Sequence, residues 1–175
     1  QKSMADIKPV VFYNGTVILA DGLIENGVVV CHEDRIQAVG HRKDIPVPGD
    51  ALMIDAGNNF IGPGYVDIHV NGGDGADFMD GTTEAVTTAA RAHARHGATS
   101  IFPTTTTGSP RQIEAMLLSC QSARKTWRVE DGARVAGVHF YGPYFAEDQV
   151  GCHLRSILNF PITARKMKRH LYSAS

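Results

Sequence analysis

The feature that most constrains the fold is a strand–loop–helix unit that recurs in the second part of the chain. Apolar, β-rich runs lie at residues 65–70, 99–102 and 134–139, and each is followed by a polar or glycine-rich loop. The runs start about 35 residues apart, which is typical of βαβ crossovers onto a parallel sheet. The pattern predicts an α/β domain with a parallel sheet over residues 63–175.

Two helices between these runs have clear start signals. Thr82 is the expected N-cap of the first helix, and Gly97 lies just beyond its expected end. Ser109, Pro110 and Gln112 begin the second helix with a capping box and a proline at the first helical position. Apolar residues recur at helical spacing in both segments, so each helix is predicted to bury one face.

The first part of the chain, residues 7–62, is predicted to be a small β-rich domain. Asn14-Gly15 lies between two β-rich runs and predicts a type I′ hairpin turn, because both turn positions need a positive φ. Further short strands are expected at residues 28–31, 35–39 and 52–54. Together these strands predict a β-meander.

Composition excludes several functional classes. Seventeen Lys and Arg against 18 Asp and Glu give a net charge of -1, which removes the electrostatic case for a nucleic-acid or polybasic membrane binder. No apolar run reaches the about 18 residues that a membrane helix needs. The first residues carry no apolar region of a signal peptide. Three widely spaced cysteines indicate reduced thiols and a cytoplasmic location.

Polar residues at the carboxyl ends of the predicted strands are the candidate site, because active sites of α/β folds form there. His69 and Asn71 lie two residues apart and face the same side of an extended chain. They could bind a metal or substrate, although an amide is a poor zinc ligand. A histidine that is only hydrogen-bonded at a strand end is the alternative.

Two other segments have both a functional and an ordinary interpretation. Residues 104–107 are four threonines that either line a polar pocket or form a self-solvating loop. His153 lies in the loop after the third strand and is either functional or solvated. Cys152 precedes it, but adjacent residues seldom present their side chains to each other, which argues against a nucleophile–base pair.

The order of motifs resembles the opening of the amidohydrolase superfamily. The β-rich runs are followed by Ile-Asp-Ala-Gly at residues 54–57 and by Pro-Gly-Tyr-Val-Asp-Ile-His at residues 63–69. The motifs at residues 69–80 and 97–107, with His139-x-x-Gly142-Pro143 and Gly151-x-His153, resemble the N-acetylglucosamine-6-phosphate deacetylase family. The resemblance covers residues 10–155.

This resemblance implies a small β-sandwich followed by a (β/α)₈ (TIM) barrel, of which the chain would carry the first three βα units, apparently truncated. It implies hydrolysis of an N-acetyl group to glucosamine 6-phosphate and acetate. One zinc-type divalent ion would polarise the carbonyl and activate a water, and an Asp would handle the protons. His69 matches the first metal-site position, while Asn71 replaces a second histidine. Cys152 and His153 match substrate-contacting positions.

Two departures from the family pattern bear on activity. The family motif after strand three is His-Leu-Glu-Gly-Pro, and its Glu is a metal ligand. Tyr141 occupies that slot here, and a neutral phenol is a poor substitute for a carboxylate. Glu147 lies nearby without a spacing that brings it to the metal. The family's later histidines and catalytic Asp belong to strands beyond Ser175, so no catalytic residue is expected within this chain, which would be inactive alone.

The implied partner is a small-molecule sugar phosphate, and the resemblance also implies a homodimer. Two alternatives stay open at this point. One is a non-catalytic phosphosugar-binding or assembly module derived from the family, with its metal site lost at Tyr141. The other is a different amidohydrolase that acts on a cyclic amide, which would favour His-x-His over the observed His69-x-Asn71.

Overall fold

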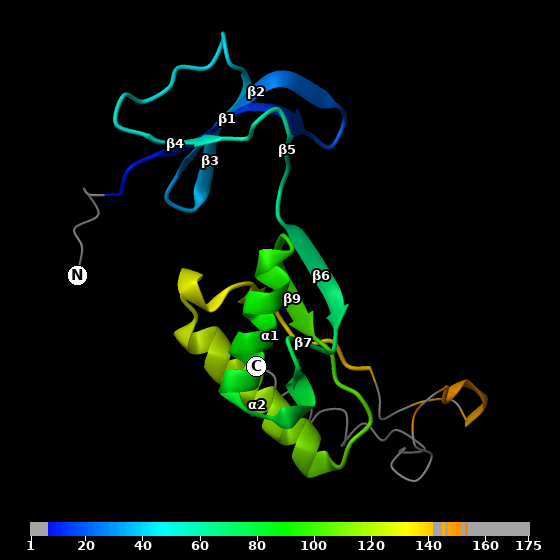
Figure 1. Cartoon of the computed structure of the whole chain (residues 1–175). Coiled ribbons are helices and arrows are strands. Elements are labelled where there is room, and N and C mark those ends of the chain that lie inside the picture. The colour runs from blue at the N-terminus through cyan, green and yellow to red at the C-terminus, as the bar shows by residue number, and fades with distance from the viewer. Residues whose placement is uncertain (1–6, 142–144, 146, 152, 154–175) are drawn as a thin grey trace. The chain divides into compact units, whose positions relative to one another are not determined.

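The computed structural model describes residues 7–141, 145, 147–151 and 153 (Figure 1). The chain divides into two compact units, Gln1–Pro63 and Gly64–Ser175. The first unit is built from strands, and the second combines strands with helices. Each is described below by itself.

A five-stranded sheet forms the first unit. Its strand order is β3-β2-β1-β4, and β5 also pairs with β1. The strands are β1 (Val10–Ile18), β2 (Leu23–His32), β3 (Arg35–His41), β4 (Leu52–Asp55) and β5 (Phe60–Ile61). The first three run antiparallel, but β4 and β5 pair with β1 in parallel, so the expected meander is wrong beyond β3. The described residues form one sheet, without the second layer of a sandwich.

The Asn14-Gly15 prediction is wrong, because β1 runs through this dipeptide without reversing. Asn14 has a φ of 56°, and the β1–β2 register shifts around Gly15 as in a β-bulge. The Asn14 side chain donates to Asp55 Oδ1 at 2.8 Å, and a Cβ on Gly15 would lie 2.6 Å from the carbonyl oxygen of Asn59. The positive φ of Asn14 is compatible with either a bulge or a type I′ turn. The contacts of Asn14 and Gly15 with residues 55 and 59 favour the bulge.

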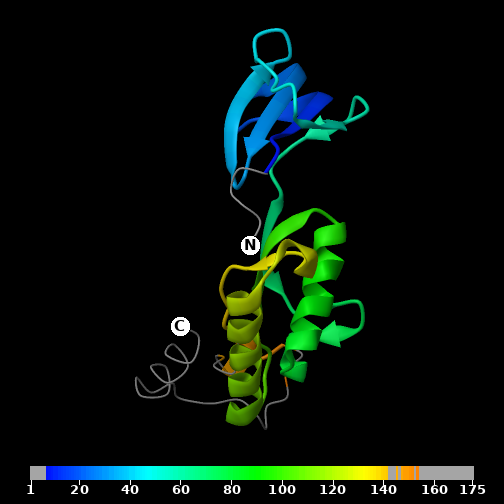
Figure 2. The same ribbon diagram turned by 90° about the vertical axis from the view of Figure 1, so that its left-hand side faces the viewer.

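The second unit contains the predicted parallel sheet, with strand order β10-β9-β6. Its strands are β6 (Tyr65–Val70), β9 (Ala98–Pro103) and β10 (Arg134–Val135), and its helices are α1 (Thr83–Arg95) and α2 (Pro110–Thr126). The two helices pack side by side along the strands (Figures 1 and 2). The α/β prediction is therefore confirmed for this unit.

The third strand is shorter than the sequence predicts. Regular pairing covers only Arg134–Val135, and an isolated bridge joins His139 to Thr104 further along. Between them lies Gly137, where a Cβ would come within 2.9 Å of the Phe102 ring. The close approach of this ring to the backbone accompanies the break in pairing.

Short elements connect the strands and helices. They are β7 (Gly72–Gly73), β8 (Ala76–Asp77), η2 (Phe78–Asp80), η3 (Val129–Asp131) and η4 (Glu147–Gln149). The antiparallel pair β7–β8 is a hairpin closed by Asp74 and Gly75, with φ of 52° and 80°. A hairpin turn with positive φ, expected at Asn14-Gly15, thus occurs at Asp74-Gly75, within a segment that the sequence predicts to be a glycine-rich loop.

Both helix starts are confirmed. Thr82 Oγ1 accepts the Ala85 N–H at 3.1 Å. Ser109 and Gln112 form a reciprocal capping box, with contacts of 2.8 and 3.3 Å. The core of this unit lies between the two helices and the sheet. Its members are Val70, Phe78, Val86, Ala89, Ala90, Ala98, Ile101, Met116, Cys120, Ala133 and Val135.

Among the described residues, no further strand pairs with either outer strand of the three-stranded sheet. Its outer strands are β6 and β10, and the described residues do not close a barrel. On β6, Tyr65 is 72% exposed and Ile68 is 68% exposed, so large apolar side chains lie uncovered along this edge. Among the helices of the described part, none has the length and apolarity needed for a membrane span.

Replacing Ser109 tests the stabilising role of the α2 cap. We expect Ser109→Ala to lower the free energy of unfolding by about 1 kcal/mol, because the Gln112 N–H loses its side-chain acceptor. Urea denaturation followed by circular dichroism measures the change. Ser122→Ala, an exposed serine inside the same helix, is the matched control and should not destabilise the chain. Equal losses in both variants would contradict a capping role.

Candidate functional site

Aromatic and imidazole rings converge where the parallel strands of the second unit end. The His69 ring centre lies 4.9 Å from that of His139 and 5.1 Å from that of Tyr141. His153 lies 5.3 Å from Tyr141 and stacks on Phe145 at 4.6 Å. We call these five residues the ring cluster. It joins residues far apart in the sequence at the strand edge where α/β folds place their sites.

Backbone pairing positions the ring cluster. The Thr104 N–H donates to the Val70 carbonyl at 2.8 Å, and the Thr105 N–H donates to the His139 carbonyl at 2.9 Å. The Tyr141 N–H then donates to Thr105 Oγ1 at 3.0 Å. The segments that follow the strands therefore stay hydrogen-bonded to each other. This pairing brings His69, His139 and Tyr141 to one edge of the sheet.

The buried Thr104 hydroxyl orients His139. Its Oγ1 donates to the Phe102 carbonyl at 3.1 Å and accepts the Val70 N–H at 3.0 Å. Nδ1 of His139 lies 3.3 Å from the same oxygen. Which of these two atoms donates depends on the His139 tautomer. With the hydroxyl proton on the Phe102 carbonyl, the imidazole donates from Nδ1 and its Nε2 keeps a lone pair.

His153 has one partnered and one unpartnered ring nitrogen. Nδ1 lies 3.3 Å from Thr107 Oγ1. Nε2 is buried and has no hydrogen-bond partner among the described residues. A buried polar atom without a partner costs about 1–3 kcal/mol, so this nitrogen is suited to accept or donate a hydrogen bond to a ligand.

The structure brings together some, but not all, of the residues that the sequence singles out. His69, Tyr141 and His153 lie in the ring cluster. Asn71 is exposed, and its backbone carbonyl accepts the Phe78 N–H at 3.0 Å. Cys152 lies outside the described residues. Of the four threonines at residues 104–107, Thr104 and Thr107 contact cluster histidines, which favours the pocket interpretation for these two.

Two cluster members were not among the predicted site residues, although His139 stands in the motif at the end of the third predicted strand. His139 precedes Tyr141 by two residues, and period-2 spacing along an extended chain was a usable signal for placing both on one side. Phe145 offered no such signal, because a lone aromatic in a loop has no periodicity. Only the folded arrangement shows that it stacks on His153.

The ring cluster fits two ligands of a metal ion but not a complete set. His69 and His139 offer imidazole nitrogens, and the phenol of Tyr141 beside them is a poor metal ligand. Among the described residues, no group of three or more His, Cys, Asp or Glu side chains is arranged to hold an ion. Structural zinc sites take four ligands and catalytic ones take three plus water, so these residues alone do not make a site.

A histidine on α1, His93, has a structural contact outside the ring cluster. Nε2 of His93, on α1, lies 2.9 Å from the Gly72 carbonyl oxygen and ties the helix to the β7–β8 hairpin. His93 also lies in the last turn of α1, where a basic side chain suits the helix dipole. Its contact is with the backbone of the hairpin, and not only with the end of the helix dipole.

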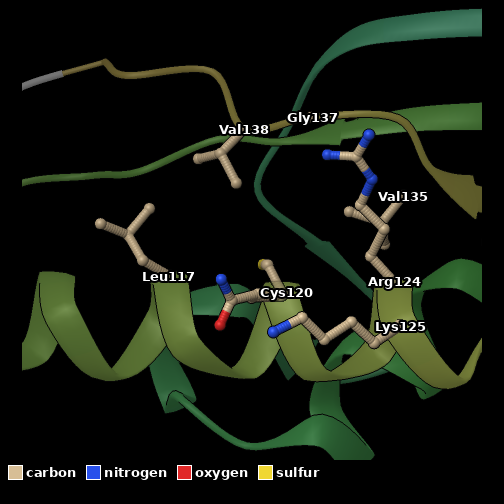
Figure 3. Close-up of a pocket in the computed structure, with 8 residues that line it drawn as sticks. Leu117, Cys120, Arg124, Lys125, Val135, Gly137 and Val138 are labelled. Atoms are coloured by element: carbon tan, nitrogen blue, oxygen red, sulfur yellow. The ribbon is translucent and has the colours of Figure 1, made fainter. Parts of the chain in front are cut away.

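A separate cavity of about 300 Å³ lies between α2 and β10. Figure 3 shows Arg124 and Lys125 projecting from α2 beside it, with Cys120 on the same helix and Val135 and Val138 opposite. Burial raises the pKa of the Cys120 thiol to about 12. This cysteine is therefore a protonated core residue at neutral pH and not a nucleophile.

No family model matches the chain, but the curated proteins that it resembles are deacetylases of N-acetylhexosamine 6-phosphates. It is 38% identical over 129 residues to an N-acetylglucosamine-6-phosphate deacetylase of Vibrio furnissii, in a match that covers 74% of the chain. It is 34% identical over 131 residues to an N-acetylgalactosamine-6-phosphate deacetylase of Escherichia coli O157:H7, covering 75% of the chain. The chain spans only 29% and 34% of the lengths of these relatives.

Solved structures show the same likeness in fold. An N-acetylglucosamine-6-phosphate deacetylase from Pasteurella multocida matches with a TM-score of 0.83 at 21% identity, covering 94% of this chain and 42% of that one. A Mycobacterium smegmatis deacetylase in complex with N-acetyl-D-glucosamine-6-phosphate matches with a TM-score of 0.79 at 23% identity. The match covers 95% of this chain and 41% of that one. At these identities the match shows the fold alone.

The raised pKa of Cys120 makes its alkylation slow. At pH 8 we expect native Cys120 to react with iodoacetamide about a thousandfold more slowly than in the urea-unfolded chain, because almost no thiolate is present and the sulfur is buried. Peptide mapping by mass spectrometry gives the rate for each cysteine, and half-buried Cys31 is the comparison within the same sample. Equal native and unfolded rates at Cys120 would show that its thiol is accessible.

Removing the Thr104 hydroxyl tests the assigned His139 tautomer. We expect Thr104→Val to lower the free energy of unfolding by about 1–3 kcal/mol, because the buried Val70 N–H loses its acceptor. The population of the Nδ1–H tautomer of His139 should also fall, and long-range ¹H–¹⁵N spectra of the imidazole measure this population. Thr106→Val, in the same threonine run, is the control and should leave the His139 signals unchanged. An unchanged tautomer in Thr104→Val would refute the assignment.

Proposed function

We propose that this chain, a homologue of the N-acetylglucosamine-6-phosphate deacetylases, serves in hydrolysis of the N-acetyl group of an N-acetylhexosamine 6-phosphate. The observation that carries the proposal is the convergence of His69, His139 and His153 at the carboxyl edge of the parallel sheet. Products would be the amino sugar 6-phosphate and acetate. The two curated relatives are named for different sugars, so either C4 epimer is a candidate substrate.

The fold supports this proposal at the level of architecture. The second unit has the β6–α1–β9–α2–β10 order of successive βα units, with all three strands parallel. We propose that these are the first three units of a (β/α)₈ barrel and that the β-sheet unit is part of the accompanying sandwich. The open edges of β6 and β10 are where further strands would pair.

His153 is the proposed substrate contact. Its unpartnered Nε2 can bond a polar group of the sugar phosphate, while Thr107 holds the opposite ring nitrogen. His139 belongs to the same ring cluster, where Tyr141 contacts both histidines. No step is assigned to an ion held by the ring cluster, because its donor set is incomplete. The single divalent ion and the homodimer that the resemblance implies stay predictions, as does the cytoplasmic location that the cysteines indicate.

A second candidate function is a non-catalytic phosphosugar-binding module. Tyr141 favours it, since this neutral side chain stands where the resemblance places a ligand carboxylate. In that case the ring cluster would bind the sugar phosphate without hydrolysing its amide. The two functions differ in acetate release but not in substrate binding, so both must be measured on the same protein.

Acetate release tests the proposed function directly. We expect the natural polypeptide to release acetate from N-acetylglucosamine 6-phosphate or its C4 epimer. His153→Ala should lower kcat/KM by about 10- to 100-fold, the effect of losing one hydrogen bond to a charged or strongly polar ligand. His96→Ala, which removes a histidine at the end of α1, is the matched control and should leave activity within about twofold. Intact mass and peptide mapping of residues 135–175 accompany the assay.

The outcomes separate the candidates. Tight binding of the sugar phosphate by calorimetry without acetate release would establish the binding module and overturn the deacetylase. Absence of both binding and hydrolysis would overturn both candidates. Hydrolysis that His153→Ala leaves unchanged would keep the deacetylase but remove His153 from its substrate site.

A further inference from the structure

The dipeptide Asn-Gly occurs three times in the chain, at residues 14–15, 26–27 and 71–72. Asn-Gly is the sequence most prone to deamidation. Because glycine has no Cβ, its backbone nitrogen can approach the side-chain amide of the preceding asparagine. The three copies share this local chemistry and differ in their surroundings, so the structure decides which of them can react in the folded chain.

Two of the copies are protected by the five-stranded sheet of the first unit. Asn14-Gly15 is part of β1 and Asn26-Gly27 is part of β2, and both glycines are buried. The Asn14 side chain is also held by its hydrogen bond to Asp55 Oδ1 at 2.8 Å. A glycine nitrogen buried in a sheet is shielded from water and base, so these copies can react only after the sheet opens.

The third copy is open to solvent at the candidate site. Asn71 is exposed, and its side chain makes no hydrogen bond to any residue that the structure describes. It lies outside regular secondary structure, between β6 and the two-residue strand β7. Gly72, which supplies the nitrogen, is only partly buried. Both reacting groups are therefore within reach of water in the folded chain.

The register of the β7–β8 hairpin leaves the Gly72 nitrogen unpaired with β8. The Phe78 N–H donates to the Asn71 carbonyl at 3.0 Å, so these two residues form a hydrogen-bonded pair. Such pairs alternate with non-hydrogen-bonded ones along an antiparallel ladder, and the next pair is Gly72 with Asp77. The Gly72 N–H thus points away from β8. The bond to the Asn71 carbonyl also polarises this peptide and makes its N–H a better acid.

We propose that Asn71 is a modification site at which the folded chain deamidates. The deprotonated Gly72 nitrogen attacks Cγ of Asn71 and forms a succinimide, and the side-chain nitrogen leaves as ammonia with a proton from solvent. Water then opens the ring and leaves aspartate or isoaspartate. Apart from water the step needs no co-reactant. Its product carries a new negative charge two residues from His69, beside the ring cluster.

Peptide mapping of the full chain measures all three rates in one sample. During incubation of the folded chain at mildly alkaline pH, we expect Asn71 to deamidate at least about tenfold faster than Asn14 or Asn26, which wait for the sheet to open. In the urea-unfolded chain the three rates should agree within about threefold, because the local sequence is the same. Mass spectrometry detects the replacement of NH by O, and electron-transfer fragmentation separates aspartate from isoaspartate.

The consequence for ligand binding rests on the proposed function, in which the ring cluster receives a sugar phosphate. A carboxylate at residue 71 repels the phosphate group, so Asn71→Asp should weaken binding of N-acetylglucosamine 6-phosphate by about twofold to fivefold at low salt. Asn71→Gln, which adds no charge, is the matched control and should bind as the wild type does. Circular dichroism of both variants establishes that they are folded before calorimetry.

Two results would overturn the modification site. One is a rate at Asn71 in the folded chain no faster than those at Asn14 and Asn26. The other is an intact Asn71 in the folded chain under conditions where the unfolded chain reacts. Equal affinities of Asn71→Asp and Asn71→Gln would overturn the effect on binding. Because the mapping uses no ligand, a chain that neither binds nor hydrolyses the sugar phosphate would count against the proposed function alone.

Discussion

The buried hydroxyl of Thr104 is the interaction on which the arrangement of the candidate site depends. It bonds the backbone of β6 at Val70, the carbonyl of Phe102 on β9 and the ring of His139 after β10. One oxygen therefore links the carboxyl ends of all three parallel strands. Because Thr104 is fully buried, these bonds are shielded from water, and breaking any one leaves a buried polar group unpaired.

The ring cluster follows from this link. Hydrogen bonds between the strand ends place His69, His139 and Tyr141 at one edge of the parallel sheet. Thr105 Oγ1 extends this pairing by accepting the Tyr141 N–H. The cluster combines imidazoles with the phenol of Tyr141 and the phenyl ring of Phe145, and the edge-to-face contacts of Tyr141 contribute modestly to its stability. Such a group can bind and orient an uncharged or anionic ligand, but without a carboxylate it is a poor cage for a divalent cation.

Residues that act through their nearest neighbours were predictable from the sequence. Ser109, Pro110 and Gln112 start α2 as their local chemistry requires, and the spacing of Ile113, Met116 and Cys120 correctly predicts the buried face. By contrast, Asn14-Gly15 and Asp74-Gly75 have similar local propensities, yet only the second forms a hairpin turn. The contacts of Asn14 with Asp55, far away in the sequence, decide its conformation, and no local pattern contains them.

The candidate site also combines features that the sequence predicts with features that only the folded chain shows. The sequence by itself determined the parallel α/β repeat, the helix caps and the placement of His69 and Tyr141 at strand ends, because period and capping are properties of neighbouring residues. Only the tertiary structure decided that His139 belongs to the cluster, that Phe145 stacks on His153, and that the Thr104 hydroxyl contacts the His139 ring. These depend on which strand ends meet and in what register, which is set by packing between segments distant along the chain.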